Sequence, residues 1–111
     1  AGLAPGARSV RAETPQELSV LVARATGEQR GISLAQEQAA RGEFLEALAT
    51  LERVLAANPA SGYAKLLHAI YLCRIDDRMG GAVEIGKLGK KDVAKADLAN
   101  ARAECGVTGK G

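Results

Sequence analysis

The sequence is poor in aromatic residues, and this scarcity limits the kind of core it can build. It has no Trp, and its aromatic residues are Phe44, Tyr63 and Tyr71. Apolar residues still make up 47% of the chain, with Ala, Leu and Val most abundant. β-Branched residues never alternate with polar ones over the length of a strand. Because Ala favours helices and lets them approach closely, this composition predicts an all-α domain.

A long apolar run and a dominant charge are also missing. No stretch approaches the roughly 20 apolar residues that cross a bilayer, so we expect no membrane insertion. The 15 basic and 13 acidic residues are mostly interspersed and leave a formal net charge of +2, so we expect no nucleic-acid partner. One local cluster of four lysines departs from this pattern: Lys87, Lys90, Lys91 and Lys95. It could bind an acidic peptide, an anionic lipid surface or a nucleic acid, and the alternative is that these side chains are simply solvated.

Groupings of side chains that support catalysis are scarce as well. His68 is the single histidine, and no Ser or Cys is placed to form a nucleophilic triad with it. It falls in an apolar stretch, which favours a packing role. Without a CxxC motif or a glycine-rich phosphate loop, we expect no enzyme activity, no metal and no cofactor. Acidic residues such as Glu52 are interpreted as solvated charge.

The chain divides into a helical domain and two short ends. Residues 1–13 show no periodicity and predict a flexible lead-in, residues 14–106 the domain, and residues 107–111 a flexible tail. The run from Thr14 to Glu17 has the form of a capping box and predicts a first helix that ends at Gly27. Because the chain begins at Ala1 rather than Met, we expect either that a leader has been removed or that this is part of a longer protein.

Apolar residues at helical spacing predict five further helices. These cover about residues 29–41, 44–58, 62–75, 79–88 and 92–106, and Asp92 is the expected N-cap of the last. The helix over 62–75 is apolar on more than one face, which predicts that it is covered on both sides.

Residues 30–59 and 62–93 resemble two copies of the tetratricopeptide repeat, a helix-turn-helix unit of about 34 residues. The resemblance is carried by the turn over 42–47, by Ala35, Leu51 and Val54, and by the terminal Asn58 and Pro59. In the second unit Gly81 replaces the family's usual Ala, and Gly31 and Lys65 stand where the family commonly has a large aromatic residue. The resemblance implies an antiparallel stack of two helix hairpins with a capping helix at each end; the alternative is a generic six-helix bundle.

The resemblance also implies a protein-interaction module. Members of the family are similar in binding an extended or helical peptide in a concave groove formed by the first helix of each unit. The matching residues here are Gln29, Ile32, Gln36, Ala39, Tyr63, Leu66, Ile70 and Arg74. Two alternatives remain open: the helix that begins at Thr14 packs into this groove, or the apolar face pairs with a second copy of the chain as a structural, self-associating module.

Cys73 and Cys105 are the only cysteines. If the last helix takes the place of the first helix of a third unit, it runs parallel to the helix over 62–75, and both thiols lie at similar heights. That arrangement predicts a disulfide and hence a periplasmic or otherwise exported, bacterial-type protein. The alternative is a cytoplasmic protein with two separate buried thiols.

Overall fold

The computed structural model describes residues 15–107 of the chain, and their side chains from residue 25 onward. Over that range the protein is all-helical, without strands. The helices are α1 (Pro15–Ala40), α2 (Phe44–Ala57), α3 (Gly62–Arg74), α4 (Arg78–Gly86) and α5 (Lys95–Glu104). The capping box at Thr14, the predicted lead-in over 1–13 and the end of the chain over 108–111 lie outside the described residues.

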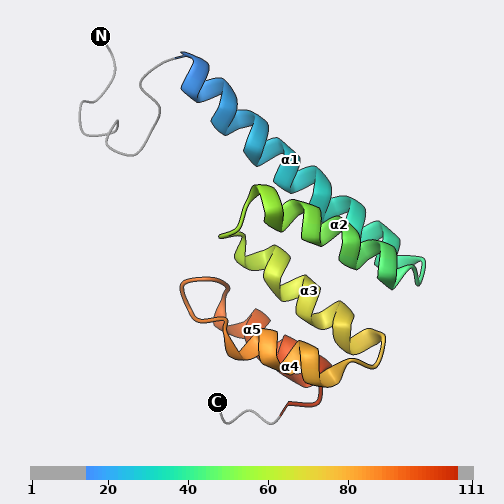
Figure 1. Cartoon of the computed structure of the whole chain (residues 1–111). Coiled ribbons are helices and arrows are strands. Elements are labelled where there is room, and N and C mark those ends of the chain that lie inside the picture. Colours follow the sequence, from blue (N-terminus) through green and yellow to red (C-terminus); the bar gives the residue numbers. More distant parts are fainter. Residues whose placement is uncertain (1–14, 108–111) are drawn as a thin grey trace.

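α1 is one continuous helix, which corrects the prediction of two separate helices with a break at Gly27. A glycine inside a helix costs about 1 kcal/mol relative to Ala, and the good helix formers Ala25, Glu28 and Gln29 lie within two residues of it. The single helix of 26 residues is therefore nearly twice as long as α2, with 14. Its N-terminal half projects beyond α2 (Figure 1). Within the described residues, the segment predicted to form a separate capping helix is the N-terminal part of α1.

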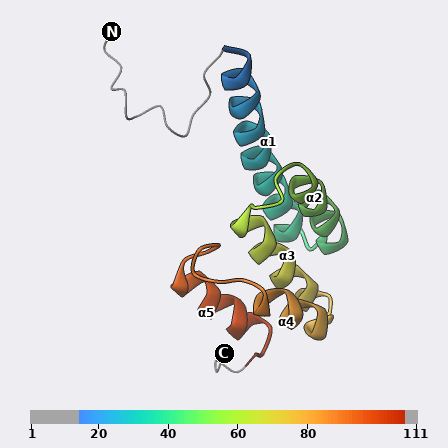
Figure 2. The ribbon, with the colours of Figure 1, turned by 60° about the vertical axis from the view of Figure 1, so that its left-hand side comes forward.

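α3 is the inner helix, with the α1–α2 pair on one side and the α4–α5 pair on the other (Figures 1 and 2). On one side Ala64, Leu67 and Tyr71 join an N-terminal cluster with buried residues of α1 and α2. On the other side Leu66, Ala69 and Cys73 join a C-terminal cluster with α4, α5 and the loop between them. Both stripes have helical spacing. The two-sided burial predicted for this helix is confirmed.

The contact between α1 and α2 is close because small and polar residues meet there. A Cβ atom at Gly31 would clash with the Cγ2 atom of Val54, so a large side chain does not fit at this position of α1. Nearby, the hydroxyl of Thr50, which is only 3% exposed, donates a hydrogen bond of 2.7 Å to the side-chain oxygen of Gln38. This bond satisfies a buried polar group and links α2 to α1.

α1, α3 and α5 end in the same way. In each, the residue after the helix C-cap has positive φ: Gly42 (80°), Asp76 (71°) and Gly106 (69°). The N–H groups of these residues and of the next ones bond back to carbonyls of the last turn, as in the Schellman motif. Asp76 is the one non-glycine among them, and Asp is among the few residues that tolerate this conformation.

α5 runs parallel to α3, although it starts later than predicted. The backbone of Asp92 lies so close to Gly62, at the start of α3, that a Cβ there would clash with it, and Cys105 meets Cys73 at the other end. Asp92 is not the helix N-cap: its carboxylate accepts a hydrogen bond of 2.9 Å from the Gly89 N–H and closes the preceding loop, and the N-cap is Ala94. Val107, predicted to begin the tail, packs against the C-terminal cluster.

Candidate functional site

Because α3 is buried on two opposite sides, it leaves two faces uncovered, and each is a candidate site. Successive helical residues are rotated by about 100°, so Tyr63 and Arg74 lie within about 20° of each other around the axis. His68 lies about 140° from Tyr63, on the other uncovered face. The face predicted to bind a peptide and the face that carries His68 therefore point in different directions.

The first candidate is the α1–α3–α5 face, which contains the residues of the predicted groove. The side-chain amide of Gln36 on α1 donates a hydrogen bond of 3.2 Å to the hydroxyl of Tyr63 on α3. Tyr63 remains 43% exposed, although it is one of only three aromatic side chains in the sequence. The bond holds a large amphipathic ring in place at the surface, which lowers the entropy that binding would cost.

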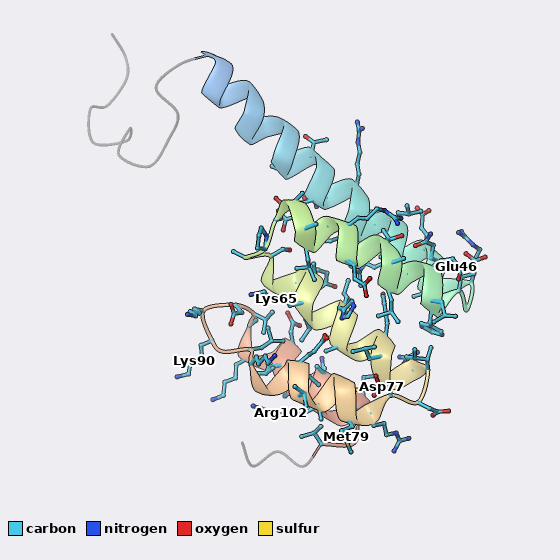
Figure 3. All side chains as sticks on the ribbon, viewed as in Figure 1. Glu46, Lys65, Asp77, Met79, Lys90 and Arg102 are labelled. Atoms are coloured by element: carbon cyan, nitrogen blue, oxygen red, sulfur yellow. A yellow bond between two sulfur atoms is a disulfide. The ribbon has the colours of Figure 1, made fainter. Side chains whose placement is uncertain are left out.

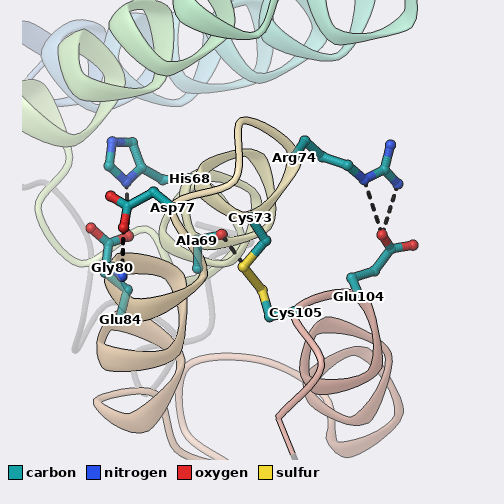
Figure 4. The surroundings of a disulfide bond; sticks show 9 residues. All are labelled: His68, Ala69, Cys73, Arg74, Asp77, Gly80, Glu84, Glu104 and Cys105. Atoms are coloured by element: carbon teal, nitrogen blue, oxygen red, sulfur yellow. Dashed lines mark hydrogen bonds and ion pairs between the residues drawn. A yellow bond between two sulfur atoms is a disulfide. The ribbon is translucent and has the colours of Figure 1, made fainter.

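Arg74 extends this face toward α5. Its guanidinium pairs with the carboxylate of Glu104 at 2.9 Å and lies 6.0 Å from the centre of the Phe44 ring. Figure 4 shows Arg74 and Glu104 beside the disulfide. Both side chains of this ion pair are more than 40% exposed, so the pair itself stabilises the fold only weakly. Arg74 keeps free surface for a partner.

The other predicted groove residues differ in accessibility. Gln29 is exposed, whereas Ile32, Ala39 and Ile70 are partly buried and pack against the N-terminal cluster. Leu66 does not line a groove: it is only 3% exposed and belongs to the C-terminal cluster, which corrects its assignment. The helical pattern could not separate these cases, because α3 is apolar on two sides.

The predicted disulfide between Cys73 and Cys105 is present in the structure. Both cysteines are buried, at 7% and 2% exposure, and they join the C-terminal ends of α3 and α5 (Figure 4). Gly81 of α4 faces this bond. A Cβ at that position would clash with the sulfur of Cys73, and it would lie 2.8 Å from the Ala69 carbonyl oxygen and 3.3 Å from the Cys105 sulfur. Glycine at position 81 therefore makes room for the disulfide between the three helices.

The second candidate is a hollow between α2 and α4 with α3 at its base, the α2–α4 cleft, with a volume of about 360 Å³. Its centre is His68, whose ring lies between two carboxylates: Nδ1 is 2.8 Å from Glu84 and Nε2 is 3.0 Å from Glu52. The ring therefore connects all three helices. The lining residues are Glu52, Leu55, Lys65, His68, Glu84, Lys87 and Leu88.

The protonation of His68 is set by two opposing effects. Burial lowers the pKa of the imidazole, since only 12% of the side chain is exposed. The hydrogen bonds and negative charges of Glu84 and Glu52 outweigh burial and raise the pKa above its ordinary value of 6.5. Two flanking carboxylates favour the imidazolium form, in which both ring nitrogens donate.

Sequence reasoning missed this arrangement. It assigned His68 to packing and Glu52 to solvated charge. Each glutamate is 16 residues from His68, one before and one after. These separations alone do not place the three side chains together, because that depends on how α2, α3 and α4 are aligned against one another.

Neither face has the donor set of a metal site, because no cluster of three or more His, Cys, Asp and Glu side chains in the described region could hold an ion. Among the described helices, none combines the length and apolarity that spanning a membrane requires. Comparisons of the chain with protein-family models, curated proteins and solved structures gave no match.

Proposed function

We propose that this chain is a tetratricopeptide-like protein-interaction module that binds a peptide segment of another protein along the α1–α3–α5 face. The observation that carries the proposal is Tyr63, a partly exposed aromatic ring held by Gln36 on the neighbouring helix. Rigid Tyr and Arg side chains tend to dominate the affinity of protein interfaces. Arg74 lies on the same face of α3 and supplies the second such group.

The repeat assignment is supported by residues that occupy equivalent places in the two hairpins, about 34 residues apart. Ala35 and Ala69 are both fully buried, and Leu51 and Ile85 are the largest fully buried side chains. Departures from the family pattern have local causes. Gly81 accommodates the disulfide, and Gly31 allows α2 to approach α1.

In this proposal α1 and α3 are the first helices of two units, and α5 takes the corresponding place in an incomplete third unit. α5 also covers one side of the stack, which a repeat array needs at its end. The disulfide supports an oxidising setting, and we place the protein in the periplasm or another exported compartment.

The test is selection of binding peptides from a random displayed library, followed by calorimetric titration against variants. We expect Tyr63→Ala and Arg74→Ala each to weaken binding of the selected peptides by about tenfold or more, as interface hot spots do. Glu104→Ala is the matched control, because it breaks the ion pair with Arg74 and leaves the guanidinium in place. Peptides that bind both Tyr63→Ala and Arg74→Ala as tightly as the parent protein would move the site off this face.

Self-association is the second candidate function, favoured by large apolar side chains that stay exposed on α4. Met79 is 80% exposed and Val83 is 54% exposed, one helical turn apart. Figure 3 shows Met79 at the edge of the molecule. Sedimentation equilibrium separates the two functions: a monomer at high concentration removes self-association, and a dimer that Met79→Ser dissociates supports it.

A further inference from the structure

We propose that the α2–α4 cleft and the adjoining lysine loop form a second docking surface, which takes a short acidic segment of a partner protein with an apolar anchor side chain. The lysine loop comprises Lys87, Lys90 and Lys91 between α4 and α5, together with Lys95, the first residue of α5. This surface lies on the opposite uncovered face of α3 from Tyr63, so it is separate from the peptide face proposed above.

The shape of the cleft sets the size of what it can hold. Its volume of about 360 Å³ is at the low end of the range for ligand sites, which suits a short segment and one or two side chains. Two of the lining residues are leucines: Leu88 is 8% exposed and Leu55 is partly buried. An apolar anchor side chain of the partner would rest on this pair.

The charges of the cleft favour an acidic ligand. Both cleft glutamates are engaged, since each places an oxygen within 3.0 Å of a ring nitrogen of His68. The lysines that line the cleft, Lys65 and Lys87, have no carboxylate within 4.0 Å among the side chains that the structure describes. With His68 protonated, the lining carries three positive and two negative charges, so the cleft has a net charge of +1 and offers two unpaired ammonium groups.

The lysine loop extends this positive charge out of the cleft. Lys87 belongs to both, and it is followed by exposed Lys90, Lys91 and Lys95. Figure 3 shows Lys90 pointing away from the loop at the same side of the molecule as Lys65. The nearest acidic residue in the loop, Asp92, is held by the Gly89 N–H. An acidic segment anchored in the cleft can thus continue along the loop.

The lining chemistry favours a peptide over other polyanions. The seven lining residues include no Phe, Tyr or Trp, and only 12% of the His68 side chain is exposed, so the cleft offers little platform on which bases would stack. Glu52 and Glu84 would repel a closely spaced row of phosphates, whereas an acidic peptide can place an apolar side chain beside them. The hollow form of the site also does not match the plane of a lipid headgroup layer.

The experiment measures fluorescence anisotropy of a labelled acidic octapeptide of Asp and Glu with two central Leu residues, at about 150 mM salt, where charges beyond about 8 Å are screened. The variant is Lys65→Ala with Lys87→Ala. Its matched control is Arg30→Ala with Arg41→Ala, which removes the same net charge from two exposed positions, one in α1 and one directly after it. We expect about tenfold weaker binding for the lysine variant and less than about twofold for the control, with unchanged circular dichroism for both.

Three further measurements test the proposal. A peptide with Gly in place of both Leu residues should bind at least about fivefold more weakly, because it lacks the apolar anchor. Addition of the parent peptide should shift the ring resonances of His68, and Tyr63→Ala should leave its affinity unchanged. Equal losses in the lysine and arginine variants, no binding at about 1 mM peptide, or tighter binding of phosphatidylserine vesicles or a single-stranded oligonucleotide would each overturn it.

Discussion

Reduction of the Cys73–Cys105 disulfide should remove a large part of the stability of this domain. The bond joins residues 32 apart in the sequence. In the chain-entropy model, closing a loop of that length lowers the entropy of the unfolded chain enough to stabilise the folded state by about 4 kcal/mol at 25 °C. Domains of this size are stable by only about 5–15 kcal/mol. For a domain of about this length, the expected fall in Tm is about 15–30 °C.

The assay compares guanidinium unfolding curves of the oxidised and reduced protein, followed by circular dichroism. Because both sulfurs are buried, the reduced sample is prepared by unfolding in reductant and refolding with the thiols kept reduced. Intact mass after alkylation reports the thiol state. The oxidised form should also show the smaller dependence of unfolding free energy on denaturant, since its unfolded chain is more compact.

A Cys73→Ala, Cys105→Ala double variant serves as the control. Its stability should not respond to reductant, and it should lie close to that of the reduced parent protein. If the unfolding free energies of the oxidised and reduced parent proteins differ by less than about 1 kcal/mol, then opening the loop between Cys73 and Cys105 does not raise the entropy of the unfolded chain as assumed. That result would refute the reasoning.

The remaining predictions concern a pair of glycines and the histidine bridge. Gly27→Ala should stabilise the domain by about 0.5–1 kcal/mol, because a Cβ there meets nothing within 4 Å, whereas Gly81→Ala should destabilise it by about 1–3 kcal/mol by forcing a Cβ against the disulfide. Urea unfolding of both variants checks this, and effects of the same sign would contradict it. His68 has a raised pKa when folded, so its bridge stabilises the domain fully below about pH 6.5, and this contribution is lost as pH rises through the higher folded-state value. The unfolding free energy of the parent protein should therefore be larger at pH 6 than at pH 8, and this difference should shrink in His68→Gln. An unchanged pH dependence in the variant would rule out the bridge as its source.

Helix boundaries were predictable where a glycine or proline had only one plausible role, that of ending a helix. Gly42 ends α1, and Pro59 follows directly after α2 and its C-cap. Prediction failed where a residue had a second possible role. Gly27 lies inside α1 at modest cost. Asp92 bonds to the Gly89 N–H within the loop before α5 instead of capping that helix, and its backbone lies against Gly62.

The candidate sites were also only partly predictable from the sequence. Tyr63 and Arg74 could be placed on one face of α3 from their spacing alone. The assignment of Leu66 to that face was wrong, since spacing does not show which of two apolar stripes is covered by α4 and α5. The bridge from Glu52 through His68 to Glu84 had no local pattern at all.

The sequence by itself determined the helical class, the two hairpin turns and the inner position of α3. These features follow from local preferences and from the periodic placement of apolar residues, which act within a few turns of chain. Only the tertiary structure decided that α1 is a single helix, that the two cysteines are joined rather than separate, that Gly81 makes room for their disulfide, and that His68 joins three helices beside a lysine-lined cleft. Those features depend on distances between atoms far apart in the chain, and such distances are fixed only when the helices pack.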